Sequence, residues 1–153
     1  MLGMKMLVCV SNKEHAMDVV NYACRLAVES ASQVIVLHVQ PKQWSHSKGY
    51  VEEKEKAQFS EALNALPEHL EQFVKEPVEI MREAGVQVRP MLVEGDDLAR
   101  SILEVAAQEE VDLIVCGSTV HRMVERLFQP SITARLLRQS TRPILVVPHS
   151  EAN

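Results

Sequence analysis

Short apolar segments recur along the chain, each bounded by polar or turn residues. Four of them are almost continuously apolar, which is typical of strands covered on both faces of a parallel sheet. They are residues 6–10, 33–39, 112–117 and 143–148. A fifth segment, residues 86–93, alternates apolar and polar positions and contains Pro90, so it is predicted to be an edge strand.

Amphipathic stretches lie between these segments. Residues 14–30, 96–109 and 131–140 repeat apolar side chains at helical spacing. The long stretch 51–84 is also helical in pattern. Within it, Pro67 is predicted to open a second helix, Pro77 to kink or break that helix, and Gly85 to end it. Strand and helix therefore alternate along the chain.

This alternation predicts an α/β fold with an open five-stranded parallel sheet, doubly wound and Rossmann-like, in the strand order 3-2-1-4-5. A length of 153 residues suits one domain, expected over residues 1–150. In such a sheet ligands bind beyond the carboxyl ends of the strands, where the strand order reverses. Here that crevice is predicted between the first and fourth strands.

Composition narrows the class of protein. A net charge of −5 argues against broad binding to nucleic acid or anionic lipid. No apolar run approaches the roughly 20 residues of a membrane span, and the first residues do not resemble a signal peptide. Cys9, Cys24 and Cys116 are odd in number and widely spaced, which indicates reduced thiols and a cytoplasmic location. Cys9 and Cys116 fall on strands predicted to be neighbours, although isolated strand cysteines usually serve as small core residues.

Common catalytic and phosphate-binding motifs are absent from the sequence. There is no Gly-x-Gly-x-x-Gly after the first strand, no P-loop and no Gly-x-Ser-x-Gly elbow. The first strand ends in Ser11-Asn12, where a phospho-receiver domain would need carboxylates. We therefore expect neither catalytic residues nor a metal site, and the protein is predicted not to be an enzyme.

The chain resembles the universal stress protein family over nearly its whole length. The similar segments are KMLVCVSNKEHAMDVVNYACRLA, VIVLHV, VEGDDLARSILEVAAQEEVDLIVCGS and ARLLRQSTRPILVVP. The resemblance implies a cytosolic homodimer paired through the last strand, Pro143 to Pro148. It also implies the place of an ATP site, which many members build from Gly, two residues, Gly, nine residues and Gly-Ser, with an Asp at the end of the first strand.

Several positions depart from that family pattern. Gly117 and Ser131 match it, but Val120 and Pro130 stand where the pattern has glycines, and Ser11 replaces the Asp. Valine disfavours a positive φ, and proline has no N–H to donate to a phosphate. The chain thus resembles the branch of the family that lacks the glycines. No cofactor is expected beyond weak binding of ATP or AMP.

Two hypotheses follow for the function. In the first, a non-enzymatic stress-response domain acts as a homodimer through protein partners, with its ATP site degraded. In the second, a re-specialised crevice between the first and fourth strands binds a nucleotide or another small anion. The alternative to this second hypothesis is purely structural: Ser131 is an ordinary helix cap, and the basic residues of the loop before it are exposed to solvent. The candidate ligand-binding residues are Ser11, Asn12, Val39, Gly117, Ser118, His121, Arg122, Ser131 and Ile132.

Overall fold

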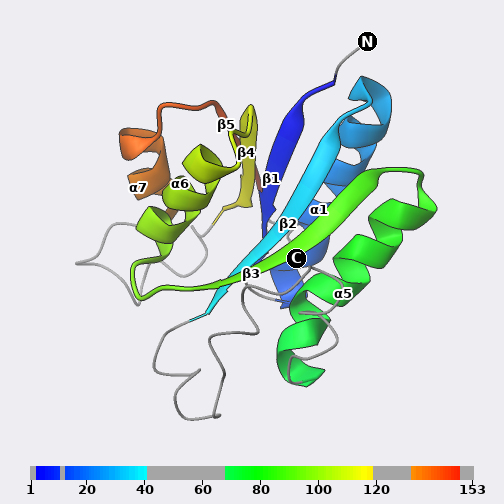
Figure 1. Ribbon diagram of the computed structural model, residues 1–153, viewed down its shortest axis with the longest axis horizontal. Coiled ribbons are helices and arrows are strands. Elements are labelled where there is room, and N and C mark those ends of the chain that lie inside the picture. Colours follow the sequence, from blue (N-terminus) through cyan, green and yellow to red (C-terminus); the bar gives the residue numbers. More distant parts are fainter. Residues whose placement is uncertain (1–2, 11–12, 41–67, 119–131, 149–153) are drawn as a thin grey trace.

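The computed structural model describes residues 3–10, 13–40, 68–118 and 132–148, and Figure 1 shows the arrangement of the helices and strands. In chain order these are β1 Lys5–Cys9, α1 Lys13–Ser30, β2 Gln33–Gln40, α5 Glu68–Glu83, β3 Gln87–Glu94, α6 Leu98–Gln108, β4 Leu113–Gly117, α7 Ile132–Gln139 and β5 Ile144–Val147. Outside the stretch 51–84, the ranges predicted from the apolar pattern agree with these bounds to within two residues. None of the helices in the described ranges is long and apolar enough to cross a bilayer.

The five strands form one parallel sheet in the order β3-β2-β1-β4-β5, which confirms the predicted fold class and strand order. Helices α1 and α5 cover one face of the sheet, and α6 and α7 cover the other (Figure 1). Successive residues of a strand point to opposite faces. Met6 and Val8 accordingly pack under α1 and α5, whereas Leu7 packs under α6 and α7, and all three are fully buried.

Pro77 does not break the helix, so that part of the prediction is wrong. Helix α5 continues from Glu68 to Glu83 with Pro77 inside it. A proline removes one i→i−4 hydrogen bond from the helix. Val74, Val78 and Met81 lie on either side of Pro77, and each is at most 1% exposed. Burial of this apolar face holds the helix against the sheet on both sides of the lost hydrogen bond.

One glycine, Gly95, and one capping residue, Asp97, fix the start of α6. A Cβ at Gly95 would lie 2.0 Å from the Ser101 hydroxyl oxygen, so only glycine allows the β3–α6 turn to approach the helix this closely. Asp97 caps the helix, and its carboxylate accepts a hydrogen bond from the Arg100 backbone N–H at 3.2 Å. The same carboxylate lies 3.0 Å from the guanidinium of Arg135 on α7, and this contact lowers the pKa of Asp97.

His38 packs in a buried, hydrogen-bonded setting. Its Nδ1 lies 3.0 Å from the Val10 carbonyl oxygen, and its ring stacks on Phe73 of α5 with centroids 4.3 Å apart. Burial lowers the pKa of His38 below its ordinary value, and the hydrogen bond to Val10 offsets part of that effect. The neutral imidazole is therefore the form that the fold favours.

The lowered pKa of His38 predicts acid sensitivity. The unfolded chain takes up the His38 proton near the ordinary pKa of 6.5, whereas the folded chain does so only at lower pH. Stability present above pH 6.5 should thus be lost as the pH falls from 6.5 through the folded pKa. In urea unfolding at several pH values, His38→Phe, which keeps a ring beside Phe73, should show a shallower loss of unfolding free energy than the parent. Parallel profiles would assign the acid sensitivity to other groups.

The cap at Asp97 predicts a graded response to two substitutions. Asp97→Asn keeps an oxygen that can accept from the Arg100 N–H but loses the ion pair with Arg135. Asp97→Ala loses both. Because exposed ion pairs contribute little, we expect Asp97→Ala to lower the melting temperature by roughly a few degrees and Asp97→Asn by clearly less. Equal losses in circular-dichroism melts would make the ion pair, not the cap, the stabilising contact.

Candidate functional site

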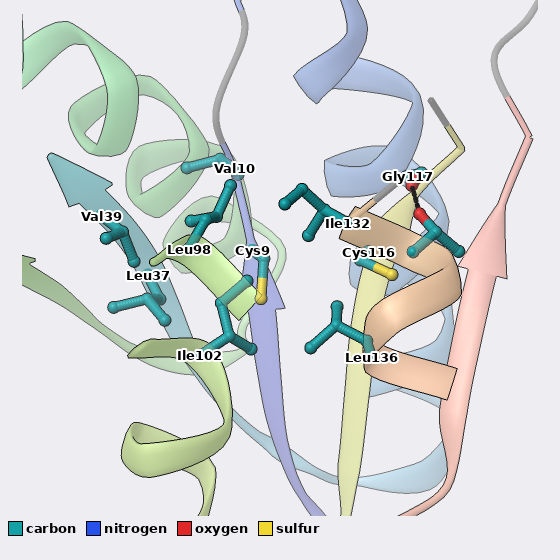
Figure 2. A pocket seen from close by; sticks show the side chains of 11 residues that line it. Cys9, Val10, Leu37, Val39, Leu98, Ile102, Cys116, Gly117, Ile132 and Leu136 are labelled. Atoms are coloured by element: carbon teal, nitrogen blue, oxygen red, sulfur yellow. Dashed lines mark hydrogen bonds between the residues drawn. The ribbon is translucent and has the colours of Figure 1, made fainter. Parts of the chain in front are cut away.

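A pocket opens at the carboxyl ends of β1, β2 and β4, between α6 and α7 (Figure 2). The space that it encloses is small, about 70 Å³. The strand order reverses at β1, so the pocket lies at the predicted switch point. It is lined by Cys9, Val10, Leu37, Val39, Leu98, Ile102, Cys116, Gly117, Ile132, Thr133 and Leu136.

The floor of the pocket is a row of residues that crosses the sheet from strand to strand. Cys9 pairs with Leu37 on β2. On its other side, Val8 pairs with Val115 of β4, so Cys9 and Cys116 occupy the next position of the same register. Both thiols therefore lie side by side on the face covered by α6 and α7, as the sequence predicted for neighbouring strands.

Burial keeps the two thiols of the floor protonated. It raises the pKa of Cys9, and the nearby Cys116 raises it further. Burial also raises the pKa of Cys116, although a hydrogen bond with the Thr133 side chain acts in the opposite direction. Neither thiol has the depressed pKa of a reactive nucleophile.

The walls are the apolar faces of two short helices. Leu98 and Ile102 project from α6, and Ile132 and Leu136 from α7, each pair one helical turn apart (Figure 2). Leu98 and Ile132 are the first residues of their helices, so both helix N-termini open on the pocket. The N-terminal end of a helix dipole favours negative charge, and at α6 the Asp97 carboxylate already caps that end.

Few polar side chains reach into the pocket from the described residues. The Thr133 hydroxyl donates a hydrogen bond of 2.9 Å to the Gly117 carbonyl oxygen and ties α7 to the end of β4 (Figure 2). A Cβ at Gly117 would lie 3.1 Å from Cγ2 of Val19, a residue of α1. The absence of a side chain at Gly117 thus allows close packing against α1 on the far face of the sheet.

The structure brings together three of the nine predicted site residues. Val39, Gly117 and Ile132 line the pocket. Ser118 does not line it, and its N–H donates to the Val147 carbonyl oxygen of β5 at 3.1 Å. The remaining predicted residues lie outside the described ranges: Ser11, Asn12, His121, Arg122 and Ser131.

Apart from Ile132, the residues of the apolar walls were not predicted as parts of a site. The helical pattern marks Leu98, Ile102 and Leu136 as buried faces, which is equally true of a core with no pocket. Cys9 follows Leu7 by two residues and must face the same side of the sheet, a signal that points to the floor. Thr133 belongs to no sequence motif. Its hydrogen bond to the Gly117 carbonyl oxygen depends on where α7 starts relative to β4.

The described lining of the pocket is mainly apolar. The described lining offers aliphatic side chains, two thiols and the Thr133 hydroxyl, and it includes no carboxylate, imidazole or amine. Within the described residues, no three His, Cys, Asp or Glu side chains gather as metal ligands. The pocket therefore has a mainly apolar interior, with the first residues of α6 and α7 at its mouth.

Solved structures of several proteins share this fold. Hypothetical protein MJ0577 superposes with a TM-score of 0.72 at 23% identity, over 99% of this chain and 100% of that one. A universal stress protein in complex with cAMP gives 0.67 at 19% identity, covering 97% and 99% of the two chains. A universal stress protein from Archaeoglobus fulgidus in complex with dAMP gives 0.64 at 18% identity, covering 96% and 99%.

Sequence comparisons identify the family. Universal stress protein MJ0531 of Methanocaldococcus jannaschii is 32% identical over 82 residues, a match that covers 54% of this chain and 48% of that protein. The match thus spans about half the length of that relative. The sequence model of the universal stress protein family matches residues 4–148, nearly the whole chain. The chain belongs to the universal stress protein family.

Proposed function

We propose that this protein is a non-enzymatic, cytoplasmic homodimer whose pocket binds a compact adenine nucleotide, such as AMP or a cyclic nucleotide, in preference to ATP. Occupancy of the pocket would then be passed on to protein partners. The observation that carries the proposal is the apolar pocket at the switch point, into which two helix N-termini open. This proposal joins the two hypotheses drawn from the sequence.

The interior of the pocket supports binding of a base. Leu98 and Ile102 on α6 face Ile132 and Leu136 on α7 across the pocket, as Figure 2 shows. Aliphatic side chains on two sides give a flat ring favourable contact without demanding a particular charge. Structural relatives were solved in complex with cAMP and dAMP, which are nucleotides with a single phosphate.

The sequence of the loop argues against a strong triphosphate site. Val120 and Pro130 replace the glycines of the family pattern, and Pro130 has no N–H to offer. A hydrogen bond to a charged acceptor contributes about 1.5–3 kcal/mol, so each lost donor weakens binding by roughly one to two orders of magnitude. A single phosphate depends on fewer such donors and can use the helix N-termini.

The edge of the sheet supports the proposed dimer. Strand β5 is at one end of the strand order and pairs with β4. The Pro143 carbonyl oxygen accepts a hydrogen bond from the Ile114 N–H of β4, and the Val147 carbonyl oxygen accepts one from the Ser118 N–H. Because alternate residues of a strand bond to opposite sides, the N–H and C=O groups of Ile144 and Val146 point away from β4. An apolar edge strand with outward peptide groups can pair with a second copy of itself.

The first prediction from the proposal concerns ligand selectivity. AMP and cAMP should raise the melting temperature of the protein more than ATP does at equal concentration, because ATP lacks its phosphate cradle. A ligand at a hundredfold excess over its dissociation constant stabilises the fold by about 2.7 kcal/mol, which a thermal-shift assay detects easily. A flat response to all three nucleotides would remove the nucleotide-binding part of the proposal.

Two substitutions on α7 provide matched controls for that titration. Ile132→Trp places a large ring in the pocket and should abolish the shift. Leu137→Trp adds the same ring at a position that is 57% exposed and should leave the shift unchanged. Equal responses of both variants would mean that the nucleotide binds elsewhere.

The account of the lost ATP site has its own test. A variant carrying Ser11→Asp, Val120→Gly and Pro130→Gly restores the family pattern at every departing position. We expect it to bind ATP at least about tenfold more tightly than the parent by isothermal calorimetry, since one backbone donor is regained at position 130 and glycine at position 120 accepts a positive φ. Unchanged affinity would show that these substitutions do not limit ATP binding.

The proposed dimer predicts a defined response to an edge substitution. Sedimentation at micromolar concentration should show a dimer for the parent. Val146→Pro removes an N–H that points away from β4, so the sheet within one chain keeps its hydrogen bonds while pairing with a second copy is blocked. We expect this variant to sediment as a folded monomer. A monomeric parent, or a variant that remains dimeric, would exclude pairing through β5.

A further inference from the structure

An ion pair joins the two helices that wall the pocket. The Asp97 carboxylate caps α6, and both of its oxygens lie 3.0 Å from Nη2 of Arg135 on α7. Asp97 directly precedes Leu98 along the chain, and Arg135 lies within one helical turn of Ile132 and Leu136. These three neighbours line the pocket. The ion pair therefore runs from one wall to the other, at the end of α6 that opens on the pocket.

The pocket between these walls encloses too little space for a whole nucleotide. Its enclosed volume of about 70 Å³ is well below the roughly 300 Å³ at which small-molecule sites usually begin. Because the walls belong to α6 and α7, the direct way to gain room is to move these helices apart. The bridge between Asp97 and Arg135 spans the same gap, so it lengthens or breaks when the walls part.

The position of the ion pair suits exchange rather than permanent closure. The Asp97 side chain is 44% exposed and that of Arg135 is 26% exposed, so water competes for both charged groups. Ion pairs in such positions add little to stability. The Asp97 carboxylate also has a second partner, because its Oδ1 accepts a hydrogen bond from the Arg100 N–H. Release of Arg135 therefore costs little and leaves the cap of α6 in place.

Release of Arg135 also supplies a positive charge that the described lining lacks. That lining consists of aliphatic groups, thiols, a hydroxyl and a glycine, none of them positively charged. A guanidinium presents its N–H donors in a planar fork that matches phosphate oxygens, and hydrogen bonds between two charged groups are stronger than neutral ones. Arg135 does not belong to the lining, so a phosphate bound to it stays at the rim, outside the aliphatic interior that receives the base.

We infer that Arg135 binds the phosphate of the nucleotide and exchanges the Asp97 carboxylate for it when the ligand enters. The inference rests on the proposed function and names the residue by which the site prefers a nucleotide to its uncharged nucleoside. Before binding, the ion pair holds the ends of α6 and α7 together. In the complex, Arg135 contacts the phosphate, while Asp97 keeps its hydrogen bond with the Arg100 N–H.

The exchange predicts opposite effects of two substitutions that break the same ion pair. Arg135→Gln removes the cation and should weaken AMP binding by roughly ten- to a hundredfold, because charged hydrogen bonds to the phosphate are lost. Asp97→Asn removes the competing carboxylate but keeps an oxygen for the cap, so AMP should bind a few-fold more tightly. If the ion pair only held α6 and α7 in place, both substitutions would change the affinity for AMP in the same direction.

Calorimetric titration of the full chain with AMP and with adenosine tests the exchange. Adenosine has no phosphate, so Arg135→Gln should bind it at least as tightly as the parent does, and the preference for AMP over adenosine should fall. Arg138→Gln is the matched control, because it removes an exposed arginine from the same helix. This control should keep both the affinity and the preference of the parent. Circular dichroism checks that each variant is folded, and Asp97→Asn gives an independent answer if Arg135→Gln is unstable.

The possible results separate the role of Arg135 from the proposed function. A lower preference for AMP in Arg135→Gln, with tighter AMP binding in Asp97→Asn, supports the exchange. If the parent binds AMP but the preference is unchanged in Arg135→Gln, or if both ion-pair variants are weakened alike, the role of Arg135 is overturned and the nucleotide site remains. If the parent binds neither AMP nor adenosine, the proposed function fails, and the role of Arg135 fails with it.

Discussion

The rest of the structure depends on the burial of β1 on both faces. Met6, Leu7 and Val8 are fully enclosed, with alternate residues packed under α1 and α5 or under α6 and α7. A strand covered on both sides must have a neighbour along each edge, because its backbone groups have no water to bond. Strand β2 lies on one edge and β4 on the other, so the chain winds in opposite directions from this strand.

That winding also creates the pocket. Where the connections diverge, the carboxyl ends of β1 and β4 are left uncovered between α6 and α7. The floor is then a continuation of the core: Leu37, Cys9 and Cys116 follow the buried residues below them at every second position. An apolar interior is the consequence, and polarity enters mainly through the helix N-termini at the mouth.

In the proposed function, the pocket concerns the base of a nucleotide, whereas the loop sequence concerns its phosphates. The aliphatic walls suit a ring and are built from ordinary core residues, which any member of such a fold can retain at little cost. A phosphate cradle is more demanding, because it depends on backbone conformations and N–H groups that Val120 and Pro130 do not favour. The proposed function therefore separates binding of the base from binding of a triphosphate.

The sequence by itself determined the class of fold, the strand order and the place of the pocket. Nearly continuous apolar runs such as residues 33–39 have one stable use, burial on both faces of a parallel sheet, so local pattern was enough. Only the tertiary structure decided that α5 runs through Pro77, that Thr133 meets the Gly117 carbonyl oxygen, and that Cys9 and Cys116 line the pocket between α6 and α7. These outcomes depend on the packing of segments distant in sequence, where burial outweighs local propensity and register sets which side chains meet.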